Sequence, residues 1–172
     1  DAGITPLMNL ILFYPTTTIE DITETIENTI ELVNYGSRLT VYPFIEFYAG
    51  ASMLEKESFN FIYEKFNING KNLKLPSLIL PHSDKIRELA TKSVKLRKEL
   101  LDKILKKYNW TGIVPHPLYG LILFLAVYKI LNLKTDKIEN SIDKILMKES
   151  EESKQEINNT IKIKGAVSNG RS

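Results

Sequence analysis

The chain has 172 residues, of which 43% are hydrophobic and 26% are charged, and its formal net charge is +2. That length suits one ordinary domain, or one and a half small ones, and the composition suits a globular protein with a buried core. The sequence has no cysteine, which excludes disulfides, thiolate metal sites, cysteine nucleophiles and iron–sulfur ligation by this chain itself.

The charge is unevenly distributed. Residues 1–55 carry eight acids and a single base, Arg38, whereas residues 56–172 carry thirteen acids and 22 bases. This step predicts a boundary near residue 55. Most of the bases are lysines that lie away from aromatic residues, so we expect solvated helix faces and disfavour nucleic-acid binding.

Neither a signal peptide nor a membrane span is predicted. The first apolar run has no basic segment before it. The longest unbroken apolar run of the segment 118–133 covers residues 121–128, well short of the ~18–20 residues that a spanning helix needs. We therefore expect a buried helix there, no membrane partner and a cytoplasmic location.

The first 55 residues predict a strand, a helix and a strand. Residues 7–14 form an apolar run closed by Pro15, typical of a strand buried on both faces. A threonine-rich cap then predicts a helix over residues 19–33, whose Ile and Val side chains recur at helical spacing. A second strand is predicted over residues 39–47.

This order is a βαβ unit, which joins parallel strands. Its two strands alone would leave sheet edges exposed. Either sequence outside this chain or its own C-terminal half must complete the core, and we favour the first.

A β-hairpin is predicted next. The runs at residues 59–66 and 73–80 flank Asn69 and Gly70, and this pair of residue types is the strongest short-range hairpin signal. Pro76 predicts that the second strand lies at a sheet edge, because proline cannot donate to a ladder.

Helices and a polar tail follow. Ser83 caps a predicted amphipathic helix that runs to about residue 107, Pro117 begins another to about residue 131, and a short helix covers 136–148. The tail is polar and expected to be disordered. The predicted regions are the strand–helix–strand unit (1–55), hairpin and linker (56–81), a helical region (82–148) and the tail (149–172).

Two features near the first strand could bind a ligand. Asn9 lies within an apolar strand, so we expect a buried amide that either pairs with neighbouring backbone or points at a bound ligand; we weigh these equally. Thr16, Thr17 and Thr18 join a strand to a helix N-terminus, where anions bind, but a plain helix cap is the favoured interpretation.

Three ionisable residues are weaker candidates. Glu46 lies in an aromatic strand end, where burial could raise its pKa for acid–base chemistry, but we prefer a solvent-facing or ion-paired carboxylate. His82 and His116 are two isolated histidines, which do not make a triad or a metal site, and they are interpreted as structural. No phosphate-binding loop, dinucleotide glycine fingerprint or paired-carboxylate arrangement is present in the sequence.

The order of elements resembles the radical S-adenosylmethionine superfamily. Residues 10–26 read as an apolar strand ending in aromatic-Pro, a threonine turn and Glu-Asp-Ile-x-x-Thr-Ile, similar to the fifth strand and following helix of these barrels. Residues 47–51, Phe-Tyr-Ala-Gly-Ala, are similar to the end of the sixth strand. The closest likeness is to the type often preceded by a cobalamin-binding domain, with the C-terminal hairpin and helices as an extension.

The resemblance implies an α/β fold in which the βαβ unit is part of a (β/α) TIM-like barrel. It further implies that the chain is the C-terminal portion of an enzyme in which a four-iron four-sulfur cluster cleaves S-adenosylmethionine to start radical chemistry. The cluster ligands would lie in an upstream part of the same polypeptide, so this chain alone would be inactive. Cobalamin is a further cofactor that the resemblance admits.

Two residues take roles from the resemblance. Asn9 matches a strand position that contacts the ribose or methionine of the cofactor, and Ile11 matches one that packs on adenine. Residues two apart on a strand share a face, so both can look inward. Catalytic residues, substrate and metal ligands are not assigned within this chain. The alternative hypothesis is a standalone, non-catalytic binding or regulatory α/β module.

Overall fold

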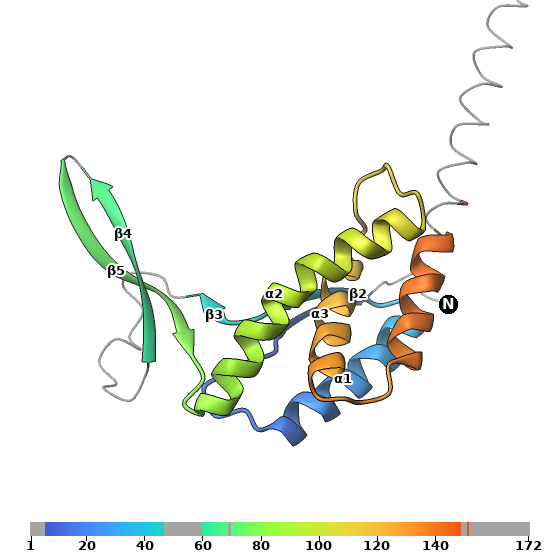
Figure 1. Cartoon of the computed structure of the whole chain (residues 1–172), viewed down its shortest axis with the longest axis horizontal. Coiled ribbons are helices and arrows are strands. Elements are labelled where there is room, and N and C mark those ends of the chain that lie inside the picture. The colour runs from blue at the N-terminus through green and yellow to red at the C-terminus, as the bar shows by residue number, and fades with distance from the viewer. Residues whose placement is uncertain (1–5, 47–59, 69, 149–150, 152–172) are drawn as a thin grey trace, which may run out of the picture.

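The computed structural model describes residues 6–46, 60–68, 70–148 and 151. Within them the protein is a mixed α/β fold with four helices and two small sheets (Figure 1). The predicted α/β class is therefore confirmed at this level. The motif at residues 47–51 and the predicted tail, apart from residue 151, lie outside the described residues.

The predicted βαβ unit is present. Strands β1 (Leu7–Ile11) and β2 (Arg38–Tyr42) pair in parallel, with Asn9 opposite Thr40. Helix α1 (Ile19–Asn34) joins them. The turn after α1 requires Gly36, whose φ of +95° lies in the left-handed region that side chains disfavour.

Both strands differ from the prediction in extent. The first ends at Ile11, and only one of its faces is covered by the described residues, so the expectation of burial on both faces is wrong for this part of the chain. The second strand breaks at Pro43, which has no amide hydrogen to continue a ladder. After the break, β3 (Ile45–Glu46) joins the other sheet.

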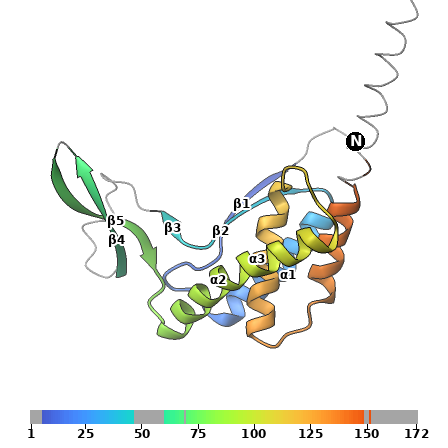
Figure 2. The ribbon, with the colours of Figure 1, turned by 45° about the horizontal axis from the view of Figure 1, so that its top comes forward.

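The hairpin is confirmed and longer than predicted. It consists of β4 (Asn60–Ile68) and β5 (Lys71–Leu80). Figures 1 and 2 show it projecting away from the helices. The strand order is β3-β5-β4, so β5 is central and its predicted edge position is wrong. Pro76 is tolerated because β3 pairs only with Leu78 and Ile79, beyond the proline, and because the β4–β5 register shifts beside it.

The three predicted helices are present. They are α2 (Asp84–Lys107), α3 (His116–Ile130) and a fourth helix at residues 136–148. Every residue of α3 from 120 to 128 is buried, which confirms the predicted buried helix. Among the described residues, no helix combines the length and apolar character needed to cross a bilayer.

Helix α3 lies at the centre of the hydrophobic core. The core includes Ile26 of α1, Leu89 of α2, Phe124 of α3 and Ile142 of the fourth helix, together with Leu39 of β2. The C-terminal half therefore does pack onto the βαβ unit. Among the described residues it does so on one face only, since α1, α2 and α3 all lie on the same side of β1 and β2 (Figure 2).

The close approach of α3 to the sheet depends on Gly120. A Cβ atom at this position would lie 2.6 Å from Val41 Cγ2 and 3.0 Å from Leu39 Cδ2. Real Cβ atoms do not approach carbon so closely, so a larger residue would push the helix away from the strands. Gly120 thus sets the spacing between the central helix and the covered face of the sheet.

Polar contacts tie the fourth helix to its neighbours. The Tyr108 hydroxyl, just after α2, donates a hydrogen bond to Asp143, and this bond together with burial raises the pKa of Tyr108. The Ser141 hydroxyl lies 3.1 Å from Asn34 Oδ1 at the end of α1. These contacts fix the fourth helix against both α1 and α2.

Candidate ligand site on the open face of the sheet

The open face of the β1–β2 sheet carries exposed apolar side chains. Strand alternation places Met8, Leu10, Leu39 and Val41 against the core. The opposite face presents Leu7, Ile11 and Tyr42, which are 65%, 41% and 43% exposed. Parallel sheets are normally covered on both faces, so this face is a surface on which a ligand or another part of a protein can lie.

Asn9 lies on this open face between Leu7 and Ile11. The residue is exposed, so the prediction of a buried amide is wrong. Its side chain makes no hydrogen bond with the residues that the structure describes, and the alternative of pairing with neighbouring backbone is therefore not observed there. The amide is available to donate and accept hydrogen bonds beside the exposed Ile11 side chain.

The threonine turn at the end of β1 acts as a helix cap. Thr18 is the N-cap of α1, and its hydroxyl accepts a 3.1 Å hydrogen bond from the Asp21 amide. The Asp21 carboxylate in return accepts a 2.9 Å hydrogen bond from the Thr18 amide. Hydrogen bonds from the Thr18 backbone and side chain hold the pKa of Asp21 below its usual value. The favoured interpretation of this turn, a plain cap, is confirmed.

A shallow depression of about 340 Å³ lies beside this cap. Thr16 and Thr17 line it together with His82, Ser83 and Lys85 at the start of α2. The segments are joined by a 2.8 Å hydrogen bond from the His82 amide to the Pro15 carbonyl. The depression brings the N-termini of α1 and α2 together beside the hydrogen-bonded cap of α1.

The remaining candidates lie apart from one another. His116 opens α3, and its Nδ1 atom is 3.4 Å from Thr40 Oγ1 and 3.5 Å from the Leu39 carbonyl oxygen. Glu46 is exposed at the end of β3. Among the described residues, no three His, Asp or Glu side chains are grouped closely enough to hold a metal ion.

The sequence prediction missed a cleft at the amino ends of the strands, which Arg38 of β2 lines together with Lys144 and Lys148 of the fourth helix. Two signals were available. Arg38 is the single base among the first 55 residues, and the two lysines are spaced i, i+4 on one helix. Only the packing of the fourth helix against the end of α1 brings them to one cleft.

Comparison with protein-family models, with curated proteins and with solved structures found no match for this chain.

Proposed function

We propose that this chain is the closing part of a radical S-adenosylmethionine barrel whose remaining strands lie in an upstream part of the same polypeptide. The observation that supports this proposal is the one-sided covering of the parallel sheet (Figure 2). In a doubly wound sheet, helices cover both faces, whereas in a (β/α) barrel they cover the outer face only and the inner face looks into the barrel. A parallel pair with helices on one side and an apolar open face fits the second arrangement.

The open face suits S-adenosylmethionine at two positions. The exposed Asn9 amide can hydrogen-bond the hydroxyls of the ribose or the amino acid part, and Ile11, on the same face, offers an apolar surface for adenine. In this proposal the cofactor, bound to a four-iron four-sulfur cluster, supplies the 5′-deoxyadenosyl radical that takes a hydrogen atom from substrate. This chain has no cysteine, so the cluster ligands belong to the upstream part.

The same proposal places the enzyme in the cytoplasm and allows a cobalamin-binding domain before the barrel. Cobalamin would then be a second cofactor. The substrate is recognised by loops outside the described residues.

A specific observation favours the alternative, a standalone binding or regulatory module. The C-terminal helices share one hydrophobic core with the βαβ unit, with Leu121, Phe124 and Ile138 fully buried. A shared core of this kind allows the chain to fold as one unit. The two proposals therefore differ in what covers the open face: further barrel strands, or a separate binding partner.

The first experiment is the intact mass of the natural polypeptide, measured by mass spectrometry of protein from its source cells. A chain longer by a few hundred N-terminal residues that include a CxxxCxxC motif is the expected result. A native mass near 19.7 kDa would contradict the enzyme proposal and leave the module.

Asn9→Ala tests the cofactor role in the complete polypeptide. After anaerobic cluster reconstitution, we expect S-adenosylmethionine to bind about tenfold more weakly, since one hydrogen bond to a polar ligand is lost. The measurement is equilibrium dialysis with the labelled cofactor. Asn28→Ala, an exposed asparagine on α1, is the matched control and leaves affinity unchanged. Equal affinity in the Asn9 and Asn28 variants would remove Asn9 from the site.

A further inference from the structure

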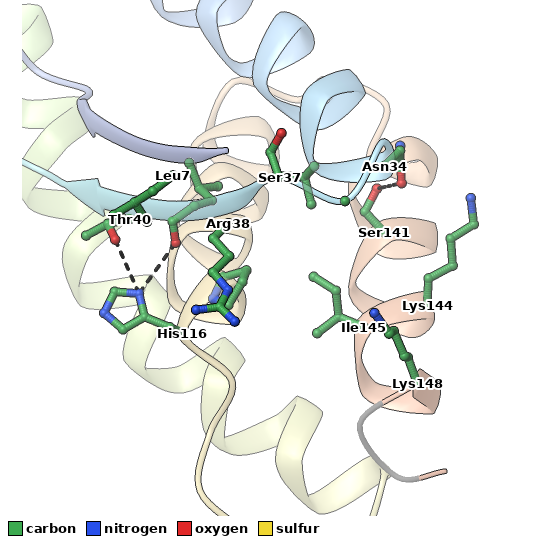
Figure 3. A pocket seen from close by; sticks show the side chains of 14 residues that line it. Leu7, Asn34, Ser37, Arg38, Thr40, His116, Ser141, Lys144, Ile145 and Lys148 are labelled. Carbon is green, nitrogen blue, oxygen red and sulfur yellow. Dashed lines mark hydrogen bonds between the residues drawn. The ribbon is translucent and has the colours of Figure 1, made fainter. Parts of the chain in front are cut away.

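A cleft of about 910 Å³ lies at the amino ends of β1 and β2. Figure 3 shows Arg38 and His116 on one wall and Lys144, Ile145 and Lys148 of the fourth helix on the other. The cleft is at the opposite end of the sheet from the threonine cap of α1. Its volume falls within the range of small-molecule sites, about 300–1,000 Å³.

The ionisable groups that line the cleft are all basic. They are Arg38, His116, Lys144 and Lys148, and no carboxylate of the described residues lines the cleft. Arg38 and Lys144 form no ion pair with the residues that the structure describes. Other bases in the same part of the chain are paired with acids, as Lys92 is with Glu88 and Lys129 with Glu139.

These charges come from three separate elements of the fold. Arg38 begins β2, His116 begins α3, and the two lysines lie on the fourth helix. A solvated face of a lysine-rich helix would instead display its charges outward along one element. Cations on opposing walls of a cleft raise the local concentration of anions between them, and low-dielectric walls strengthen that field.

The cleft also has apolar walls. Leu7 and Ile145 contribute side chains to its lining, and Ile145 points into the cleft from the fourth helix (Figure 3). A bare inorganic anion would leave this surface and most of the volume unfilled. An anion attached to an organic group would use both the charge and the apolar lining.

We propose that this cleft binds a phosphate ester of nucleotide size. The phosphates lie between Arg38 and the Lys144–Lys148 pair, where the planar guanidinium offers two parallel N–H donors to phosphate oxygens. The organic part packs along Leu7 and Ile145. Its charges lie at the amino ends of the strands, whereas Asn9 and Ile11 of the radical enzyme proposal lie further along β1, so the two sites share only Leu7.

Isothermal titration calorimetry on the complete natural polypeptide tests the site with ATP, AMP, inorganic phosphate and adenosine as probes. We expect ATP and AMP to bind more tightly than both phosphate and adenosine. The double variant Arg38→Ala/Lys144→Ala should weaken ATP binding by about tenfold or more, the effect of losing charged hydrogen bonds. Both side chains are exposed, so the variant should keep its fold, checked by thermal melting.

The matched control is Lys95→Ala/Lys98→Ala, which removes the same charge from the exposed face of α2. We expect it to change ATP affinity by no more than about twofold, as general screening predicts. An equal loss in both double variants, or no binding of ATP to the unmodified protein, would overturn the proposal. Arg38→Lys, which keeps the charge and loses the planar fork, should give an intermediate loss.

A single-stranded RNA oligonucleotide separates a small ligand from a polymer. RNA binding that is at least tenfold tighter than ATP, with the same dependence on Arg38 and Lys144, would overturn the small-molecule assignment. Weaker RNA binding would support it.

Discussion

The two faces of the β1–β2 sheet are built from the same strands but differ in burial. On the covered face, Leu39 is 1% exposed, and a Cβ atom added to Gly120 of α3 would lie 3.0 Å from its Cδ2 atom. On the open face, Leu7 is 65% exposed and Ile11 is 41% exposed. The residue types are alike, so the difference comes from what packs on each face.

This contrast shows that the apolar pattern of a strand does not determine which of its faces other elements pack against. A strand with apolar residues at successive positions can be buried on both sides. Here all the helices near the sheet lie on one side (Figure 2), and the other side keeps its apolar residues without cover from the described residues. The open face is therefore the surface on which we expect a ligand or another part of a protein to lie.

The largest expected effect comes from truncating matched leucines on the two faces. Leu39→Ala should lower the free energy of unfolding by about 2–5 kcal/mol, since it leaves a cavity in the core. Leu7→Ala in the same 172-residue chain should change it by less than about 0.5 kcal/mol, as surface substitutions do. Urea unfolding followed by circular dichroism measures both.

The effects of Leu39→Ala and Leu7→Ala on the free energy of unfolding can also be compared in the complete polypeptide. If barrel strands cover the open face there, Leu7→Ala should approach the cost of Leu39→Ala. A negligible cost of Leu7→Ala in both chains would contradict barrel closure. A large cost in the 172-residue chain would show that the two faces are not different.

A smaller effect is expected from Gly120→Ala on the covered face. Helix propensity favours alanine by about 1 kcal/mol, whereas overpacking a close contact costs about 1–3 kcal/mol. The new Cβ would lie 2.6 Å from a methyl group of Val41, whose branched side chain has little freedom to move, so we expect a net loss of about 1 kcal/mol. Thermal melting measures it.

Gly112→Ala is the matched control for this substitution. A Cβ at Gly112 would meet its nearest atom, on Trp110, at an ordinary 3.6 Å. We expect no measurable destabilisation there. Stabilisation by Gly120→Ala would mean that α3 does not approach β2 as closely as described.

The smallest effect on stability is expected at the threonine turn, which lies between β1 and α1. Thr18→Ala should cost about 1 kcal/mol through loss of the N-cap, while Thr16→Ala should cost little. Because the pKa of Asp21 is lowered in the folded protein, its contribution is present above its unfolded value and is lost as pH falls through the folded value. The difference in the free energy of unfolding between Thr18→Ala and the unmodified chain should therefore become smaller as the pH is lowered. A cost at Thr16 equal to that at Thr18 would contradict the cap.

Much of the fold could be predicted from local pattern. The capped helix α1, the βαβ order, the hairpin at Gly70 and the buried helix α3 each depend on neighbours within one segment. The move of β3 into the other sheet and the central position of β5 could not, because both depend on how β3 pairs with a strand more than thirty residues away.

The candidate site divides in the same way. The sequence placed Asn9 and Ile11 two residues apart on one strand face, and strand geometry alone requires that they share it. It predicted Asn9 to be buried, and the structure leaves that face open. The basic cleft had no prediction at all.

By itself, then, the sequence determined the local elements and the alternation of side chains along each strand, since these follow from propensity, caps and periodicity. Only the tertiary structure decided which face of the sheet the helices cover, and which distant bases share a cleft. The reason is physical: Gly120 allows α3 to approach one face closely, and the fourth helix places Lys144 in the cleft that Arg38 also lines. Contacts between segments so far apart in the chain cannot be recognised from the periodicity of residue types within either segment.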